Sequence, residues 1–271
     1  SEPVKSMLDF SLFVTFFPHL VAGPIVRPPQ LVPQFETPRS ATMKQMTEGL
    51  LLLTLGLFMK VVLADGQLAP TANDIFGNTG AYLALDAWMG VLAFSGQIFF
   101  DFAGYSTCAI GVALCLGFIL PENFKYPYAA VGFSDFWQRW HITLSAWLRD
   151  YLYIPLGGNR QGQLKTYINL MVTMLLGGLW HGANWTFVVW GGLHGFYLWV
   201  EKFIRDKFSK RNIPTDQDVA VAGITGGNTS LAFIYALFTF FLINVTWVFF
   251  RAPTFAQAWT MLTSMFGMSG D

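Results

Sequence analysis

The sequence predicts an all-α, polytopic integral membrane protein, and three observations lead to that class. Of the 271 residues, 54% are hydrophobic and only 12% are charged, whereas about 25% of the residues of an average soluble domain carry a charge. The mean hydropathy is +0.45. Several apolar stretches approach the roughly 20 residues that a helix needs to cross a bilayer core. We therefore expect the lipid bilayer to surround much of this chain.

Several apolar stretches are candidate membrane spans. They are residues 10–26, 46–64, 83–100, 102–120, 166–181, 184–200 and 231–250. The first contains Pro18 and Pro24, which predict a bent or re-entrant element because proline breaks a helix. The fifth is short and contains a Gly-Gly pair near its end. Broken helices at membrane depth persist only where they are buried or line a cavity, so these two stretches indicate a pocket.

Basic residues predict which ends face the cytoplasm. The run 201–212 is rich in Lys and Arg, and Arg160 and Lys165 precede the fifth stretch. Because cytoplasmic loops carry an excess of positive charge, we expect 201–212 to be a cytoplasmic loop and 166–200 to be a hairpin that dips into the membrane from that side. Two further segments are predicted from their composition: a flexible loop over 218–230 and an amphipathic interfacial helix over 254–266.

Charge and cysteine content exclude some classes of protein. Sixteen Lys and Arg residues balance sixteen Asp and Glu residues, so the net charge gives no reason to expect a nucleic-acid partner. Cys108 and Cys115 fall two helical turns apart on one face, too far from each other to form a disulfide. No pair among the four histidines has the i,i+4 spacing of a helical zinc site. We therefore expect no metal and no tightly bound cofactor.

Residues 134–150 form the clearest predicted amphipathic helix. Ser134 can cap it, and Asp135 suits its first turn. Its apolar face follows the 3, 4, 7, 8 spacing of a helix and consists of Trp137, Trp140, His141, Leu144 and Leu148. His141 is therefore expected on the buried side.

His181 is the first candidate for chemistry, followed by His141 and then by His19 and His194. An ionisable residue in an apolar segment is costly unless it faces a cavity. His181 is flanked by glycines, which allow a close approach to the backbone, and by Trp180 and Trp185, which can wall a dry pocket. A neutral imidazole there can serve as a general base. The alternative is purely structural, with the glycines and tryptophans packing helices and anchoring the membrane interface.

Asp101 and Arg149 each allow two interpretations. Asp101 lies inside an apolar run, where it could position a substrate or partner, or could instead form an internal pair with an arginine or cap a helix break; the second interpretation is slightly favoured. Arg149 lies with Arg139 and Asp150 on what reads as a solvated face, although it could bind a phosphate or the carrier group of a thioester.

Six sequence blocks together carry a resemblance. They are "FFPHLVAGPIVRPPQLVPQF", "FFDFAGYSTCAIG", "PENFKYPY", "SDFWQRWHITLSAWLRDYLYIPLGGNR", "LLGGLWHGANWTFVVWGGLHG" and "WVFFRAPTFAQAWTML". In this order they resemble the bacterial branch of the membrane-bound O-acyltransferase family, and most of all its alginate O-acetyltransferase type, which includes peptidoglycan-acetylating and cellulose-acetylating members. The resemblance implies a multi-helix fold around a transmembrane tunnel in the bacterial cytoplasmic (inner) membrane.

The resemblance also implies roles for particular residues. The near-invariant histidine of the family falls on His181, the presumed catalytic base, and a second motif histidine falls on His141, a supporting residue. Substrate contacts are expected from Trp180, Asn184, Arg149 and Asp101. The donor would be acetyl-CoA or another acyl thioester. The acceptor would be a hydroxyl of an extracytoplasmic polysaccharide, reached with a periplasmic or surface acyltransferase as partner.

The chain departs from the family pattern in two ways. Family members usually carry further spans, so we expect residues 1–271 to be a single membrane domain that lacks spans at both ends. Relatives often read "GYSD" where this chain has Thr107 as the last residue, which weakens any role for that segment. Two alternative functions stay open: export of D-alanine onto teichoic acid, and a transporter or channel. A transporter would be expected to show internal repeats, and no convincing one is found.

Overall fold

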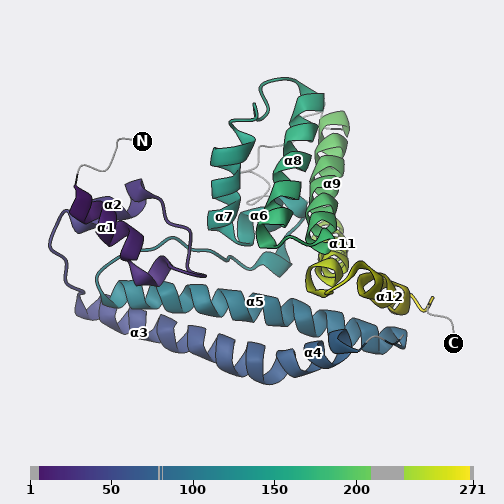
Figure 1. Cartoon of the computed structure of the whole chain (residues 1–271), viewed down its shortest axis with the longest axis horizontal. Coiled ribbons are helices and arrows are strands. Elements are labelled where there is room, and N and C mark those ends of the chain that lie inside the picture. Colours follow the sequence, from purple (N-terminus) through teal and green to yellow (C-terminus); the bar gives the residue numbers. More distant parts are fainter. Residues whose placement is uncertain (1–5, 79, 81, 209–228, 269–271) are drawn as a thin grey trace. The chain divides into compact units, whose positions relative to one another are not determined.

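The computed structural model describes residues 6–78, 80, 82–208 and 229–268. Their regular secondary structure is helical, with no strand among the described residues, which confirms the all-α class (Figure 1). They divide into two compact units. Unit 1 is Ser1–Ile75, Leu92–Lys125 and His141–Leu144, and unit 2 is Phe76–Val91, Tyr126–Trp140 and Ser145–Asp271.

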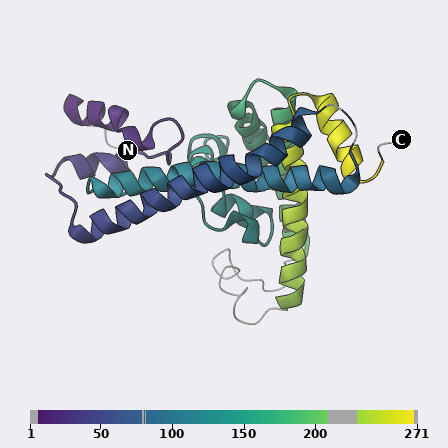
Figure 2. The ribbon, with the colours of Figure 1, turned by 90° about the horizontal axis from the view of Figure 1, so that it is seen from below.

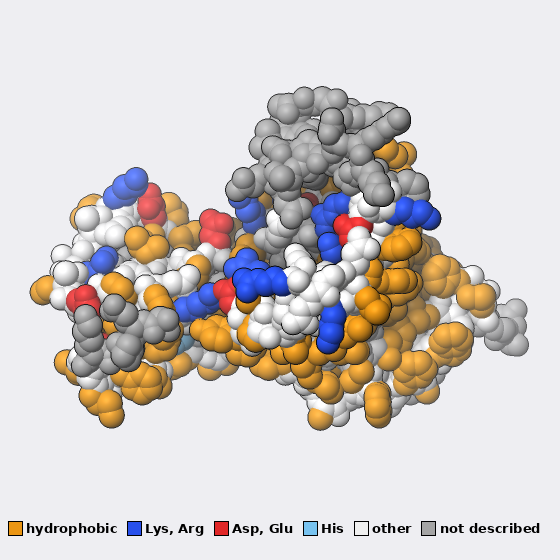
Figure 3. Space-filling model, turned by 90° about the horizontal axis from the view of Figure 1, so that it is seen from above, with side chains coloured by type: hydrophobic (Ala, Val, Ile, Leu, Met, Phe, Trp, Pro, Cys, Tyr) orange, Lys and Arg blue, Asp and Glu red, His pale blue; other side chains and the backbone are white. Residues whose placement is uncertain are grey.

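Three helical stretches in the described part of the chain are long and apolar enough to cross a membrane. They are Met43–Gly77, Ala84–Cys115 and Ser230–Arg251. The predicted spans 46–64 and 231–250 are thereby confirmed. The expectation of two spans over 83–100 and 102–120 was wrong, because α5 (Ala84–Cys115) is one continuous helix. Asp101 lies inside that helix and does not end it. Hydrophobic side chains cover large areas of the surface, as a lipid-facing protein requires (Figure 3).

The stretch 10–26 does not form one continuous helix, in agreement with the predicted bend. It folds into the short helix α1 (Met7–Thr15) and the 3-10 turn η1 (Phe17–His19), followed after a linker by α2 (Pro28–Phe35). The helix ends before Pro18, as the prolines predict, because the ring of a proline clashes with the preceding turn.

The helical stretch Met43–Gly77 contains a π-helical segment in its middle. It begins as α3 (Met43–Leu57), continues as the π-helical segment η2 (Phe58–Leu68) and ends as α4 (Ala69–Gly77). Pro70 explains the irregularity in part, because it cannot donate to the preceding turn.

Small residues let α3 and α5 lie side by side (Figures 1 and 2). A Cβ added at Gly49 would lie 2.5 Å from the sulfur of Cys115, and one at Gly56 would lie 2.6 Å from the sulfur of Cys108. Both cysteines are free, as predicted. Close approach through small side chains is how helices pack in lipid, where the hydrophobic effect offers little attraction between them.

Unit 2 is built on a helical hairpin. Helix α8 (Gln163–His181) and helix α9 (Trp185–Phe208) pack side by side and are joined by the short turn 182–184, which confirms the hairpin with "WHGAN" at its bend (Figure 1). Neither helix is among the three that are long and apolar enough to cross a membrane. Residues 201–208 belong to α9, so the expectation of a loop there was wrong; 209–212 lie outside the described residues.

Helices α11 (Thr229–Arg251) and α12 (Phe255–Met265) complete unit 2. Helix α11 packs against α9, and α12 packs against α11. The predicted interfacial helix over 254–266 is thus confirmed as a helix, capped by the Thr254 hydroxyl on the Gln257 N–H. Most of the predicted loop 218–230 lies outside the described residues, and its last two residues begin α11.

The predicted single helix over 134–150 is broken. The chain forms α6 (Phe133–Arg139), then an extended Trp140 and a left-handed His141, then α7 (Ile142–Leu148) and the π-turn η4 (Arg149–Tyr153). The predicted burial is nevertheless correct for the second half of the apolar face. Trp140, His141, Leu144 and Leu148 are all less than 9% exposed.

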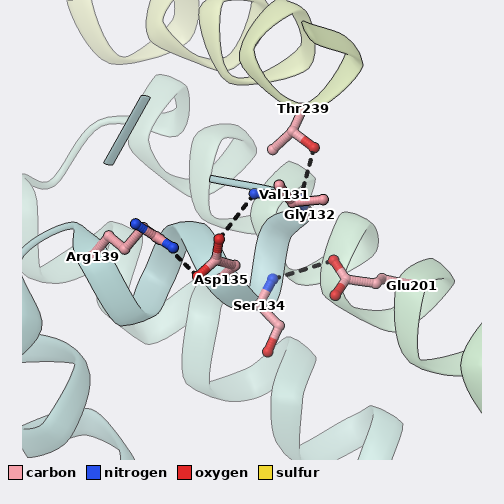
Figure 4. A network of polar contacts seen from close by, with 7 residues as sticks. All are labelled: Val131, Gly132, Ser134, Asp135, Arg139, Glu201 and Thr239. Atoms are coloured by element: carbon pink, nitrogen blue, oxygen red, sulfur yellow. Dashed lines mark hydrogen bonds and ion pairs between the residues drawn. The ribbon is translucent and has the colours of Figure 1, made fainter. Parts of the chain in front are cut away.

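The start of α6 is capped by a side chain from another helix. Ser134 is not the cap, because the N-cap position is Gly132. Glu201 of α9 instead accepts from the backbone N–H groups of Phe133 and Ser134, at 2.5 and 3.2 Å. Asp135 closes the same turn by accepting from Val131 N–H and by pairing with Arg139 at 2.7 Å (Figure 4). Burial raises the pKa of the Glu201 carboxyl, and the two N–H groups partly offset this.

Candidate functional site

His181 ends α8 at the bend of the hairpin, inside a set of aromatic rings. Its imidazole is half-buried. The centroids of Trp180, Trp190 and Phe250 lie 5.1 to 5.2 Å from that of His181, each in an edge-to-face arrangement. Among the described residues, no side chain forms a hydrogen bond with this imidazole, and the residue is partly exposed. An imidazole held in this way suits general-base chemistry.

The glycines around His181 serve packing. A Cβ at Gly178 would lie 2.3 Å from the carbonyl oxygen of Phe187, and one at Gly182 would meet the Phe187 ring at 2.6 Å. The close approach predicted from these glycines is confirmed, and the element that approaches is α9. The structural interpretation of the glycines therefore holds, and it leaves the role of the imidazole itself open.

Trp180 and Asn184, the predicted substrate contacts beside His181, differ in surroundings. Trp180 is 58% exposed, and its ring packs edge-to-face against the imidazole of His181. Asn184 caps α9 by accepting from the Thr186 N–H at 3.2 Å, and its amide donates to the carbonyl of Pro253 at 3.0 Å. These bonds fix the bend between the two helices. Substrate binding by either residue stays a prediction.

His141 has a strained backbone. Its φ angle is +43°, in the left-handed region that costs a residue with a Cβ roughly 1 to 2 kcal/mol. The ring is 4% exposed and packs edge-to-face on Phe102 with centroids 4.6 Å apart. Strain of this kind persists only where the surroundings enforce it, and it is concentrated at functional sites.

Asn123 supplies the constraint around His141. Its backbone carbonyl accepts from Ile142 N–H at 3.0 Å. Its side-chain oxygen accepts from the hydroxyl of Thr143 at 2.9 Å and its amide donates to Ser106 at 3.0 Å. All of these groups belong to unit 1. His181 belongs to unit 2, and each unit is described by itself.

Asp101 forms an ion pair, with Lys60 of η2. Lys60 also pairs with Asp65 at 2.9 Å. The internal pair that we favoured is thus present, with a lysine in place of the expected arginine. Arg149 pairs with its neighbour Asp150 at 2.7 Å, and its side chain is 64% exposed, in agreement with a solvated face. Substrate roles for Asp101 and Arg149 stay predictions.

Three residues were missed from sequence: Asn123 beside the His141 turn, Trp190 beside His181, and Glu201, which caps α6. Asn123 and Glu201 act through partners 20 and 68 residues away in the sequence, which no local pattern reveals. The described residues contain no group of three His, Cys, Asp or Glu side chains that could hold a metal ion.

The comparisons with known proteins place these features in a family. The model of the membrane-bound O-acyltransferase (MBOAT) family matches residues 4–245. The chain belongs to this family.

Named relatives refine the likeness. "Probable alginate O-acetylase AlgI" of Azotobacter vinelandii is 45% identical over 267 residues, covering 98% of this chain and 49% of the relative. "Peptidoglycan O-acetyltransferase" of Helicobacter pylori is 42% identical, covering 98% and 48%. "Teichoic acid D-alanyltransferase" of Streptococcus thermophilus is 28% identical, covering 80% and 54%. The chain therefore spans about half the length of these relatives.

Family and helices together define the location. The three apolar helical stretches and the bacterial relatives of the family make the chain part of a multi-pass protein of the bacterial inner membrane.

Proposed function

We propose that the whole protein is an O-acyltransferase that moves an acetyl group from a cytoplasmic thioester, acetyl-CoA, towards hydroxyls of an extracytoplasmic polysaccharide. The observation that carries the proposal is His181, a partly exposed imidazole at a helical bend with aromatic rings around it and no side-chain hydrogen bond among the described residues. The names of the relatives support an acetyl group and a glycan acceptor. A periplasmic or surface acyltransferase would complete the delivery as a partner.

In the proposed step, His181 acts as the general base. Its neutral imidazole takes the proton of the acceptor hydroxyl as the oxygen attacks the thioester carbonyl. The new C–O bond forms, the C–S bond breaks, and the departing thiolate receives the proton from the imidazolium. The rings of Trp190 and Phe250 pack against the imidazole and reduce its contact with water, which would limit hydrolysis of the thioester. A supporting role for His141 stays a prediction.

The test compares His181→Asn with wild type in the full-length parent gene, in cells that lack the native enzyme. We expect polysaccharide acetyl content to fall by about 10²-fold or more, the usual contribution of a general base, at unchanged membrane abundance. His19→Asn, which removes an imidazole from the η1 turn, is the matched control. Retained acetylation in His181→Asn would contradict the proposal.

Transfer of D-alanine is the second candidate, because teichoic acid D-alanyltransferases are also relatives. These match at 28% to 31% identity over 71% to 80% of the chain, whereas the acetylating relatives match at 42% or more over at least 96%. The acetyl group is therefore the better supported. Mass spectrometry of the esters released from the polysaccharide distinguishes acetate from D-alanine.

A further inference from the structure

A second histidine of unit 2 lies fully inside the protein. His194 of α9 has no exposed surface. Its ring meets those of Trp190 and Trp137, with centroids 4.8 and 5.1 Å away, and these two indoles lie 5.9 Å from each other. We call these three rings the His194 cluster. Trp190 also contacts the ring of His181, so a single indole separates His194 from the candidate base.

Thr246 of α11 determines which nitrogen of His194 carries the proton. The threonine hydroxyl lies 2.7 Å from the carbonyl oxygen of Ile243 and 3.1 Å from Nε2 of His194. A hydroxyl has one proton to donate, and the shorter distance assigns it to the carbonyl. Nε2 of the neutral ring is therefore the N–H that donates to Thr246. It follows that Nδ1 carries the lone pair and is an acceptor.

The cluster presents one acceptor and two donors that lack partners. Among the described residues, no hydrogen-bond partner reaches Nδ1 of His194 or Nε1 of Trp137 and Trp190, and all three atoms are buried. Buried polar atoms are normally satisfied, because leaving them bare costs free energy. A hydroxyl group has the complementary set of one proton and two lone pairs.

We propose that the His194 cluster is a buried binding site for one hydroxyl group. The hydroxyl donates to Nδ1 of His194 and accepts from the indole N–H groups of Trp137 and Trp190. Two sources have this chemistry: a water molecule and an alcohol of the acceptor sugar. Only the second source rests on the proposed function, because a bound water requires no transfer reaction.

The test is ¹⁵N NMR of histidine-labelled full-length protein in nanodiscs. We expect His194 to show a protonated Nε2 and an Nδ1 whose chemical shift is that of a hydrogen-bonded acceptor. His194→Gln identifies the signals by their loss. If that variant fails to fold, Thr246→Val identifies them by shifting Nε2, and Thr263→Val, which alters a hydroxyl bonded within α12, is the matched control.

A short alginate oligosaccharide separates the two sources. If the ¹⁵N shift shows a hydrogen-bonded Nδ1 in the absence of sugar, the bound hydroxyl is that of water. If the hydrogen-bonded signal appears only after sugar is added, the bound hydroxyl is that of the sugar alcohol. In the second case Trp190→Phe, which keeps an aromatic ring and removes the N–H, should raise the half-saturating sugar concentration about tenfold, the effect of one hydrogen bond. An Nδ1 with a free lone pair under both conditions, or a protonated Nδ1, overturns the proposal. The two outcomes that overturn the proposal do so whether or not His181 is the catalytic base.

Discussion

At His141 the backbone adopts a conformation that histidine seldom takes. Asn123 holds the two residues that follow, Ile142 through its backbone carbonyl and Thr143 through its side chain. The left-handed turn replaces what the sequence pattern reads as an uninterrupted helix. Because the turn separates α6 from α7, it lets the imidazole leave the helical register and pack on Phe102. A buried asparagine whose polar atoms are all engaged is the physical reason that the turn persists.

Asn123→Ala should destabilise the protein by about 1 to 3 kcal/mol, because it leaves buried groups on Thr143 and Ser106 without their partner. Thermal unfolding of the detergent-solubilised full-length protein measures the change. Gln138→Ala, an exposed change on α6, should shift stability by less than about 0.5 kcal/mol. Equal effects of the two variants would mean that Asn123 does not constrain the turn.

Among the helices, the α8–α9 hairpin depends on the absence of side chains at a few positions. A Cβ at Gly191 would lie 2.3 Å from the carbonyl oxygen of Met174, whereas one at Gly192 would make an ordinary contact of 3.5 Å with Leu175. The two glycines are neighbours in the same helix. Their difference therefore isolates the close approach of backbones from helix propensity.

Gly191→Ala should lower the free energy of unfolding by about 2 kcal/mol or more, because the helices must separate. Gly192→Ala should be neutral or should stabilise by up to about 1 kcal/mol, since alanine favours a helix over glycine. Membrane abundance and the unfolding midpoint report both changes. A tolerated Gly191→Ala would show that the hairpin packs more loosely than its geometry indicates.

The cap of α6 by Glu201 is a second contact between helices, because Glu201 belongs to α9 (Figure 4). Glu201→Ala should cost about 2 kcal/mol, because two buried N–H groups lose a charged acceptor. Glu201→Gln should restore part of that stability, since its amide oxygen can still accept. Glu48→Ala, which removes an exposed carboxylate paired with Lys44 at 3.7 Å, should change little. Equal losses from Glu201→Ala and Glu48→Ala would argue against the cap.

For the whole molecule, the charge pattern predicts an orientation in the membrane. Because α8 and α9 form a hairpin, the beginning of α8 and the end of α9 should face the same side, and Arg160, Lys165 and Lys207 assign that side to the cytoplasm. A cysteine placed at Gln163 or at Lys207 of a cysteine-free parent should react with an impermeant maleimide in inverted membrane vesicles. Reaction in intact spheroplasts would reverse the orientation.

The sequence by itself determined the membrane class, the helical hairpin, the breaking of the first stretch and the family, and it ranked His181 first. These follow from composition, from proline chemistry and from motifs that are local in the chain. Burial of His141 was also predictable, because the apolar spacing survives the break in the helix.

Tertiary structure alone decided the rest. The helix break at His141, the ion pair of Asp101 with Lys60, the cap by Glu201 and the environment of His194 each depend on groups far apart in sequence. A polar group inside an apolar protein takes its state from whichever partner the fold brings to it. Local patterns can identify such a residue as costly, but they cannot say what compensates the cost.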